Sequence, residues 1–179
     1  MRLVLVNPNW TFDLSIYFGC QEAHLPLEYG YAAALLNQHG HQTEIVDGQL
    51  EDLTLDTISA RVRDLNPDVA VVTTAPSYLF WRCPPPELRV PQQLVQQLSS
   101  IVGTIIAVGP HASTTPWSTL RKLHVDAVVM GESEEVLLKL AETPDTIERR
   151  YGPSRGRLRQ SVCTRLGYQR RCLGRIART

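Results

Sequence analysis

The sequence predicts a doubly wound α/β domain built on a parallel sheet. Between residues 1 and 142, short apolar runs alternate five times with stretches in which apolar residues recur at helical spacing. The run from Val69 to Thr74 is continuously apolar or β-branched, which suits a strand covered on both faces. Short turns separate the elements, and right-handed crossovers leave few other ways to connect them. One sheet with helices on both faces is therefore expected.

The expected elements follow one another in a regular order. Gly40 ends the first helix, and Asn66 with Pro67 ends the second. Ser133 is the expected N-cap of the last helix, followed by acidic residues that suit the helix dipole. The strands are expected at residues 3–6, 43–46, 69–74, 104–108 and 127–130, and the helices at 29–39, 55–65, 91–102, 117–123 and 133–141.

This alternation predicts a flavodoxin-like sheet of five parallel strands in the order 2-1-3-4-5. In that order the connections change direction between the first and third strands, and such folds bind ligands beyond the carboxyl ends of the strands there. We therefore expect the binding site above the ends of strands one, three, four and five.

Bulk composition restricts the class of protein. The 179 residues are enough for one domain with a substantial core, and no apolar run reaches the roughly 18 residues that span a bilayer. The apolar start, Met1 to Val6, turns at once into Asn7-Pro8-Asn9, so it is expected to be a strand and not a signal peptide. A cytoplasmic location, with four reduced cysteines, is therefore expected.

Charge divides the chain into two parts. Residues 149–179 contain ten arginines and no lysine, aspartate or glutamate, which leaves 8 basic and 18 acidic residues in 1–148. The periodic pattern also stops at about Thr143. We expect a binding domain at 1–142 and an irregular, arginine-rich tail at 143–179. Three hypotheses explain the tail: a basic arm for nucleic acid or an anionic partner, a disordered linker attracted to the acidic domain, or a segment read out of frame, which we favour.

Two kinds of loop meet at the expected binding edge. The turns after strands four and five consist of small residues, which let backbone amides approach a ligand. The loops after strands one and three hold seven of the chain's twelve aromatic residues, which either cap the core or face a large flat ligand or a partner. These seven are Trp10, Phe12, Tyr17, Phe18, Tyr78, Phe80 and Trp81.

Five landmarks, in order along residues 1–142, resemble one known module. They are Pro26-Leu27-Glu28-Tyr29-Gly30-Tyr31, Gly40 to Asp47, Asn66-Pro67-Asp68-Val69, Val108-Gly109-Pro110-His111 and Gly131-Glu132-Ser133-Glu134. The pattern is similar to the N-terminal cobalamin-binding domain of cobalamin-dependent radical S-adenosylmethionine enzymes. This resemblance implies a flavodoxin-like module that holds the corrinoid at the carboxyl edge of its sheet and presents it to a catalytic barrel.

The resemblance also implies which residues lie at the cofactor. Two turns would border the corrinoid or its nucleotide tail, and two further segments would form the other walls. The turn residues are Gly109, Pro110, His111, Ala112, Ser113, Gly131, Glu132 and Glu134, and the wall residues are Asn7, Pro8, Asn9, Thr74, Ala75 and Pro76.

One departure from related proteins concerns the lower face of the cofactor. Many cobalamin proteins supply a histidine to cobalt from an Asp-x-His-x-x-Gly motif after the first strand, whereas Asp13 here is followed by Ser15 and a late Gly19. The lower face is therefore expected to lack a protein imidazole, as in the radical enzymes of this family. His24 is an alternative ligand, and His111 is expected to make a hydrogen bond and not a metal bond.

The sequence contains no catalytic or metal-binding motif beside the module. Radical S-adenosylmethionine enzymes hold an iron–sulfur cluster with Cys-x3-Cys-x2-Cys, whereas the cysteine intervals here are 63, 80 and 9 residues. No zinc spacing is present either. We expect a cobalamin-binding module of the methyl-transfer class, truncated before its iron–sulfur domain and without catalytic residues of its own. A separate radical domain is the expected protein partner, and neither nucleic acid nor a membrane is expected.

Other functions are less consistent with the sequence. A signalling receiver needs acidic residues after the first strand and an aspartate after the third, where Asn7-Pro8-Asn9 and Thr73-Thr74-Ala75 stand. A nucleotide-binding domain would carry a glycine-rich phosphate loop, and neither Gly-x-Gly-x-x-Gly nor a P-loop follows any strand. The alternative that stays open is a non-functional fragment or a protein-interaction module that binds no cofactor.

Overall fold

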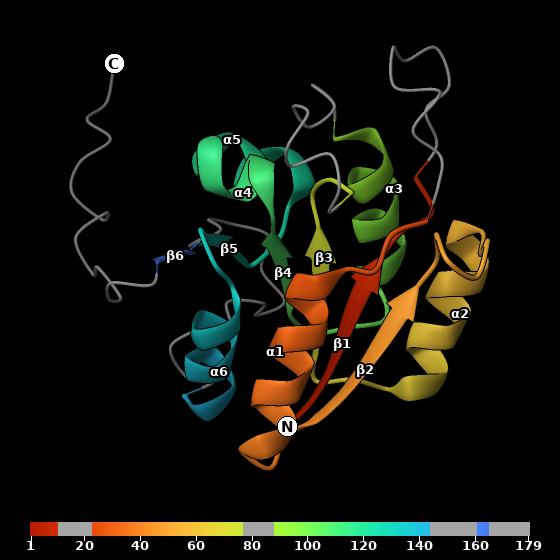
Figure 1. The fold of residues 1–179 in the computed structure, drawn as a ribbon. Coiled ribbons are helices and arrows are strands. Elements are labelled where there is room, and N and C mark those ends of the chain that lie inside the picture. The colour runs from red at the N-terminus through yellow and green to blue at the C-terminus, as the bar shows by residue number, and fades with distance from the viewer. Residues whose placement is uncertain (11–22, 77–87, 144–160, 165–179) are drawn as a thin grey trace, which may run out of the picture.

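Six strands form one parallel sheet in the part of the chain that the structure describes. The computed structural model describes residues 1–10, 23–76, 88–143 and 161–164. The strands pair in the order β2-β1-β3-β4-β5-β6, which confirms the predicted flavodoxin-like order 2-1-3-4-5 (Figure 1). Their bounds are β1 Arg2–Asn7, β2 Gln42–Asp47, β3 Val69–Thr73, β4 Ile105–Val108, β5 Ala127–Met130 and β6 Ser161–Thr164.

The sixth strand adds to the predicted five and lies in the part expected to be irregular. β6 runs parallel to β5, with Ser161 opposite Ala127 and Thr164 opposite Met130. Its short sequence shows no alternation that predicts a strand. Residues 161–164 form a strand because the backbone edge of β5 supplies their hydrogen-bonding partners. Pairing with a distant strand of this kind is not visible in a local sequence pattern.

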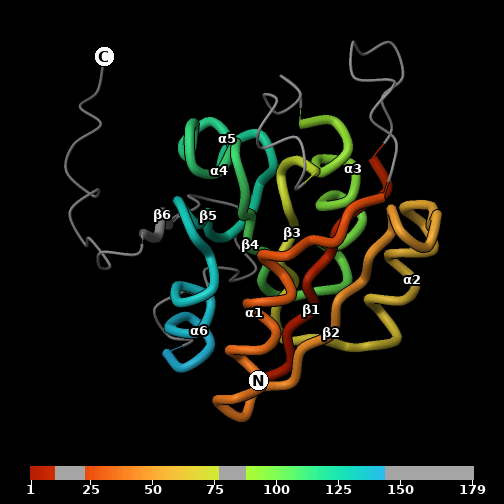
Figure 2. Tube along the Cα trace, viewed as in Figure 1, coloured from red at the N-terminus to blue at the C-terminus, as the bar shows by residue number. Residues whose placement is uncertain are grey.

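Helices cover both faces of the sheet. Figure 2 shows α1 and α6 side by side on one face, where they contact each other. On the opposite face, apolar residues of α2, α3 and α5 form the core: Ile58, Val62, Leu94, Val95, Leu98, Leu120 and Leu123. The helix bounds are α1 Leu27–Gln38, α2 Leu55–Leu65, α3 Arg89–Leu98, α4 Pro110–Thr114, α5 Pro116–Leu123 and α6 Glu134–Glu142.

Strand β1 shows how the sequence divides the core between these two faces. Leu3 and Leu5 pack with Tyr29 of α1, whereas Val4 and Val6 belong to the core on the side of α2, α3 and α5. Successive side chains of a strand point to opposite faces, so a fully apolar strand serves both cores. This explains why β1 and β3 read as continuous apolar runs.

The expected helix ends are confirmed in two places. Gly40 has φ +81°, and its N–H donates to the Asn37 carbonyl while the His41 N–H donates to that of Leu36. These are the two hydrogen bonds of a Schellman motif, which needs a left-handed residue at this position. Asn66, with φ +45°, ends α2.

Two local features differ from the expectation. Ser133 precedes α6 as expected, but it makes no side-chain capping bond and is buried. The turn after β4 forms the short helix α4, which is too brief to show periodicity in the sequence.

Among the described residues, no helix combines the length and the apolar character needed to cross a membrane.

Asp126 connects the amino-terminal ends of β4 and β5. Its Oδ2 accepts a hydrogen bond of 2.8 Å from the Ile105 N–H, and its own N–H donates to the Ile105 carbonyl at 2.9 Å. Burial raises the pKa of the Asp126 carboxyl above its ordinary value of 3.8 and outweighs the hydrogen bond from Ile105, which lowers it. The folded state therefore holds this proton more tightly than the unfolded chain does. The stabilisation that the protonated Asp126 carboxyl gives the folded state is complete below pH 3.8, and it is lost as the pH rises through the folded-state pKa.

The substitution Asp126→Asn tests this linkage because the amide keeps an oxygen for Ile105 and cannot ionise. We expect the free energy of unfolding of the variant, relative to wild type, to increase as the pH rises above 3.8. Urea unfolding at a series of pH values measures it. Asp64→Asn, at an exposed carboxyl of α2, is the control. A relative stability of Asp126→Asn that is flat or falls with pH contradicts the assignment.

Candidate functional site

The carboxyl ends of the strands form one edge of the sheet, which we call the rim. Because the strands are parallel, the ends of β1, β3, β4 and β5 lie at this edge, at Asn7, Thr73, Val108 and Met130 (Figure 1, top). The turns that follow these strands determine what the rim can bind.

The corner between β3 and β4 is closely packed. The Thr74 hydroxyl donates to the Val108 carbonyl at 2.9 Å and accepts from the His111 N–H at 3.2 Å. Gly109 has φ +98°, and a Cβ there would lie 3.0 Å from Thr74 Oγ1 and 3.1 Å from Thr73 Oγ1. The turn therefore requires glycine, both for its backbone conformation and for the close approach of β3.

The corner between β4 and β5 is bridged by a single hydroxyl. Ser113 Oγ donates to the Gly109 carbonyl at 3.0 Å and accepts from the Gly131 N–H at 2.9 Å. Gly131 has φ +78°, and a Cβ built on it meets nothing within 4 Å. This corner thus carries small residues and opens outward at Gly131.

The corner between β1 and β2 holds a buried polar group that the sequence analysis did not assign to the site. Asn7 Nδ2 donates to Asp47 Oδ1 at 2.8 Å, and Trp10 Nε1 donates to Asn7 Oδ1 at 2.9 Å. Asn9 Nδ2 donates to Asp52 Oδ1 at 3.0 Å in the neighbouring turn. The sequence signal that could have revealed Asp47 was its place directly after the expected second strand, residues 43–46.

Tyr29 lies below the rim where β1 and β3 adjoin. Its single O–H proton is shared between the carbonyls of Val6, at 3.2 Å, and Val71, at 3.3 Å, and the side chain is fully buried. Burial, with a smaller contribution from the charge of Glu28, raises the pKa of Tyr29 well above its ordinary value of 10.0. The phenol is therefore neutral and forms part of the floor between the two strands.

Two surface hollows lie between neighbouring helices in the described part of the chain. Glu132 and Glu134 line one of about 480 Å³ between α1 and α6, together with Tyr31 and Leu35 of α1. These two predicted residues thus border the α1–α6 side of the rim, and not the corner that Gly109 and Gly131 form.

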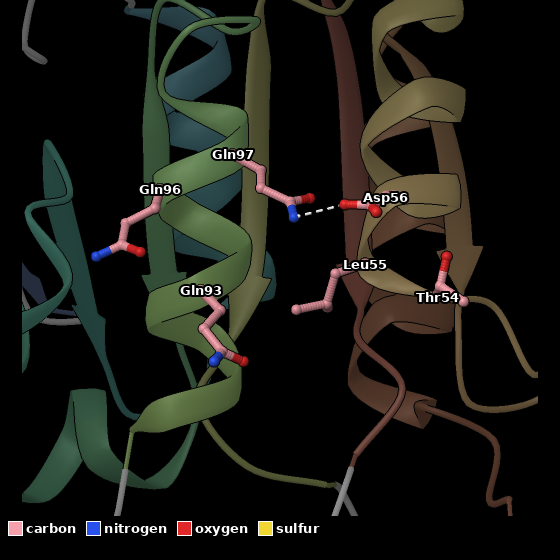
Figure 3. Close-up of a pocket in the computed structure, with 6 residues that line it drawn as sticks. All are labelled: Thr54, Leu55, Asp56, Gln93, Gln96 and Gln97. Carbon is pink, nitrogen blue, oxygen red and sulfur yellow. Dashed lines mark hydrogen bonds between the residues drawn. The ribbon is translucent and has the colours of Figure 1, made fainter.

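The second hollow, of about 520 Å³, lies between α2 and α3 (Figure 3). Gln97 reaches across it from α3 and donates to Asp56 of α2 at 2.8 Å. Its lining is largely neutral and polar: Thr54, Leu55, Asp56, Gln93, Gln96 and Gln97.

The structure places the remaining predicted residues as follows. Pro8, Ala75 and Pro76 are buried at the ends of β1 and β3. His24 is exposed in the segment before α1. Residues 13–19, which depart from the histidine motif, lie outside the described part of the chain, as do the loop aromatics other than Trp10: Phe12, Tyr17, Phe18, Tyr78, Phe80 and Trp81.

The rim suits a broad organic cofactor. Gly109, Ser113 and Gly131, which meet where the turns after β4 and β5 adjoin, are small residues, and this corner is open at Gly131. Within the described ranges, no three His, Cys, Asp or Glu residues are grouped to hold a metal ion.

Comparison with known proteins identifies the family. The family model described as the B12 binding domain matches residues 21–141, well over half of the chain. The chain therefore belongs to the B12-binding domain family, and cobalamin is its cofactor. This confirms the cofactor and the resemblance to a cobalamin-binding domain.

Individual relatives are larger proteins. The uncharacterized methyltransferase PH0819 of Pyrococcus horikoshii is 28% identical over 143 residues, which are 79% of this chain and 29% of that protein. Among solved structures, the radical S-adenosylmethionine methyltransferase TsrM from Kitasatospora setae, with cobalamin and a 4Fe–4S cluster bound, matches with a TM-score of 0.59 and 18% identity. That match covers 80% of this chain and 24% of TsrM.

A second solved structure has the same fold over this region. The cobalamin-dependent S-adenosylmethionine radical enzyme OxsB, with aqua-cobalamin bound, matches with a TM-score of 0.56 and 16% identity. It covers 83% of this chain and 19% of OxsB. The chain thus spans less than a third of the length of each of these three relatives.

The substitution Gly109→Ala tests the packing of the β3–β4 corner. We expect it to lower the free energy of unfolding by about 1–3 kcal/mol, because it combines a left-handed backbone with contacts to two threonine hydroxyls. Gly30→Ala is the matched control: this helical position has open space, so alanine should stabilise α1 by about 0.5–1 kcal/mol. Urea unfolding measures both, and equal effects would refute the proposed crowding at Gly109.

Proposed function

We propose that this chain is the cobalamin-binding module of a radical S-adenosylmethionine enzyme of the methyl-transfer class. The observation that carries the proposal is the open corner of small residues at the ends of β4 and β5, in a chain of the B12-binding family. The likeness to TsrM and OxsB, both radical S-adenosylmethionine enzymes, and to a methyltransferase supports the finer assignment.

In the proposed complex the corrin lies across the rim. Residues 109–113 and Gly131 border it at β4 and β5, and residues 7–9 and 74–76 form the other walls. The side chains of Asn7, Thr74 and Ser113 already bond within the protein, so these segments contribute shape and backbone groups.

Glu132 and Glu134 are placed differently. They border the hollow between α1 and α6, where carboxylates can accept hydrogen bonds from the amide groups at the edge of a corrinoid. We assign them to the periphery of the cofactor and not to the ring face.

The cofactor supplies a cobalt ion that can accept and pass on a methyl group. The chain's own residues bind and orient it. At the described strand ends, Asn7 bonds Asp47, and the Thr74 and Ser113 hydroxyls donate to backbone carbonyls. Tyr29 stays protonated because burial raises its pKa.

The partner of the module is a radical domain. The chain spans 24% of TsrM and 19% of OxsB, so the proposed reaction needs machinery outside the matched region. In this proposal that domain lies on another polypeptide or elsewhere in a longer protein, and it selects the substrate.

Contact with another protein domain is a second candidate function, alongside cofactor binding. One observation favours it: Leu25, Leu27 and Tyr31, at the start of α1, are 62–69% exposed. An apolar group of this kind suits contact with another domain.

Purified protein mixed with hydroxocobalamin should retain the coloured cofactor after desalting, as read from its visible spectrum. Glu132→Trp places a bulky ring at the rim and should lower the retained fraction several-fold. Gln96→Trp, at an exposed position of the α2–α3 hollow, is the matched control and should bind as wild type does. A colourless wild-type protein, or equal loss in both variants, contradicts the proposal.

The lower face of the bound cofactor should carry no histidine from the protein. We expect the electron paramagnetic resonance spectrum of the reduced, cob(II)alamin-loaded protein to be the same whether the protein is made with ¹⁴N or ¹⁵N. His24→Ala should leave it unchanged as well. A nitrogen splitting that follows the protein label and vanishes in His24→Ala would show that His24 is the ligand.

A further inference from the structure

Three side chains at the β1–β2 corner form a buried chain of hydrogen bonds. Trp10 Nε1 donates to Asn7 Oδ1 at 2.9 Å, and Asn7 Nδ2 donates to Asp47 Oδ1 at 2.8 Å. Their exposed fractions are 7%, 3% and 7%. Asp47 Oδ1 also accepts from the Leu50 N–H at 3.1 Å. We call Asp47, Asn7 and Trp10 the relay.

The chemistry of the three groups permits one arrangement. An indole N–H can only donate and an ionised carboxylate can only accept, whereas an amide does both. Asn7 therefore has to turn its oxygen to Trp10 and its nitrogen to Asp47. A buried amide with both ends used in this way cannot flip without breaking two hydrogen bonds.

Backbone contacts hold the same corner from a second direction. Asn7 and Asp47 are opposite each other in the β1–β2 register, at the last residue of each strand. The Gly48 N–H donates to the Asn7 carbonyl at 2.7 Å. The side chain of Asn9 adds a hydrogen bond from its Nδ2 to Asp52 Oδ1 at 3.0 Å. The segment 7–10 is thus fixed to the turn after β2.

We propose that the relay positions the wall of the cobalamin site that follows β1, an inference that rests on the proposed function. Asp47 stands on β2, the strand farthest from β4 and β5, and acts through Asn7 and Trp10 on the path of residues 7–10. A wall that is ordered before the cofactor arrives costs no ordering entropy on binding. Asp47 and Trp10 are positioning residues. The buried amide of Asn7 joins them, and it points into the protein and not toward the cofactor.

The test exchanges the amide of Asn7 and the carboxylate of Asp47 between the two positions. In Asn7→Asp two carboxylates face each other, so the relay breaks. In the double variant Asn7→Asp/Asp47→Asn, the new carboxylate accepts from Trp10 and from the new amide, so both side-chain hydrogen bonds of the relay are rebuilt with the donor now at position 47. Only the Leu50 N–H loses the acceptor that Asp47 Oδ1 provides. The reference background is Trp81→Phe/Trp117→Phe, in which tryptophan emission reports Trp10 alone.

Three quantities are measured for each protein: the Kd for hydroxocobalamin, the Tm and the emission maximum of Trp10. We expect Asn7→Asp to raise the Kd about tenfold, the size typical for loss of a supporting hydrogen bond, and to shift the Trp10 emission. The double variant should restore both. Val62→Ala, in the core under α2, is the control that lowers the Tm and leaves the Kd unchanged.

The outcomes separate this inference from the proposed function. If the wild-type protein takes up no hydroxocobalamin, the proposed function itself fails. If it binds, but Asn7→Asp lowers the Tm and shifts the emission without changing the Kd, the relay is purely structural and the inference is overturned. The inference is also overturned if the double variant regains its Tm and emission while its Kd stays raised.

Discussion

The parallel pairing of β1, β3, β4 and β5 is the constraint on which the rest of the structure depends. It brings the carboxyl ends of four strands to a single rim and covers each central strand on both faces. A rim of this kind presents turns and helix beginnings, and not strand edges, to a ligand. The site is therefore made of turns whose residue types decide what fits.

Each corner of the rim is fixed by its own short hydrogen bonds. Thr74 joins the end of β3 to the turn after β4, Ser113 joins the turns after β4 and β5, and Asn7 joins the ends of β1 and β2. These side chains are used within the protein. These three described corners accordingly offer a ligand a fixed shape and backbone groups.

Periodicity in the sequence predicted much of this fold because its cause is local. The apolar runs of β1 and β3 and the ends of α1 and α2 were visible in the order of residues, since burial on two faces and left-handed caps each demand particular residue types. The small residues after β4 and β5 pointed to the rim for the same reason.

The features that the sequence did not predict depend on distant partners. β6 takes its geometry from the edge of β5, and Ser133 loses its expected capping role where its side chain is buried. Asp47 is forty positions from Asn7 and meets it only through the register of two strands. Sequence patterns identify the residues of a corner more readily than the bonds between them.

The measurement that tests the central claim most directly is a crystal structure of the protein grown with cobalamin. The account predicts the corrin ring across the ends of β1, β3, β4 and β5, in contact with residues 109–113 and Gly131. A rim closed by the protein's own side chains, or a cofactor seated in the hollow between α2 and α3, would contradict it.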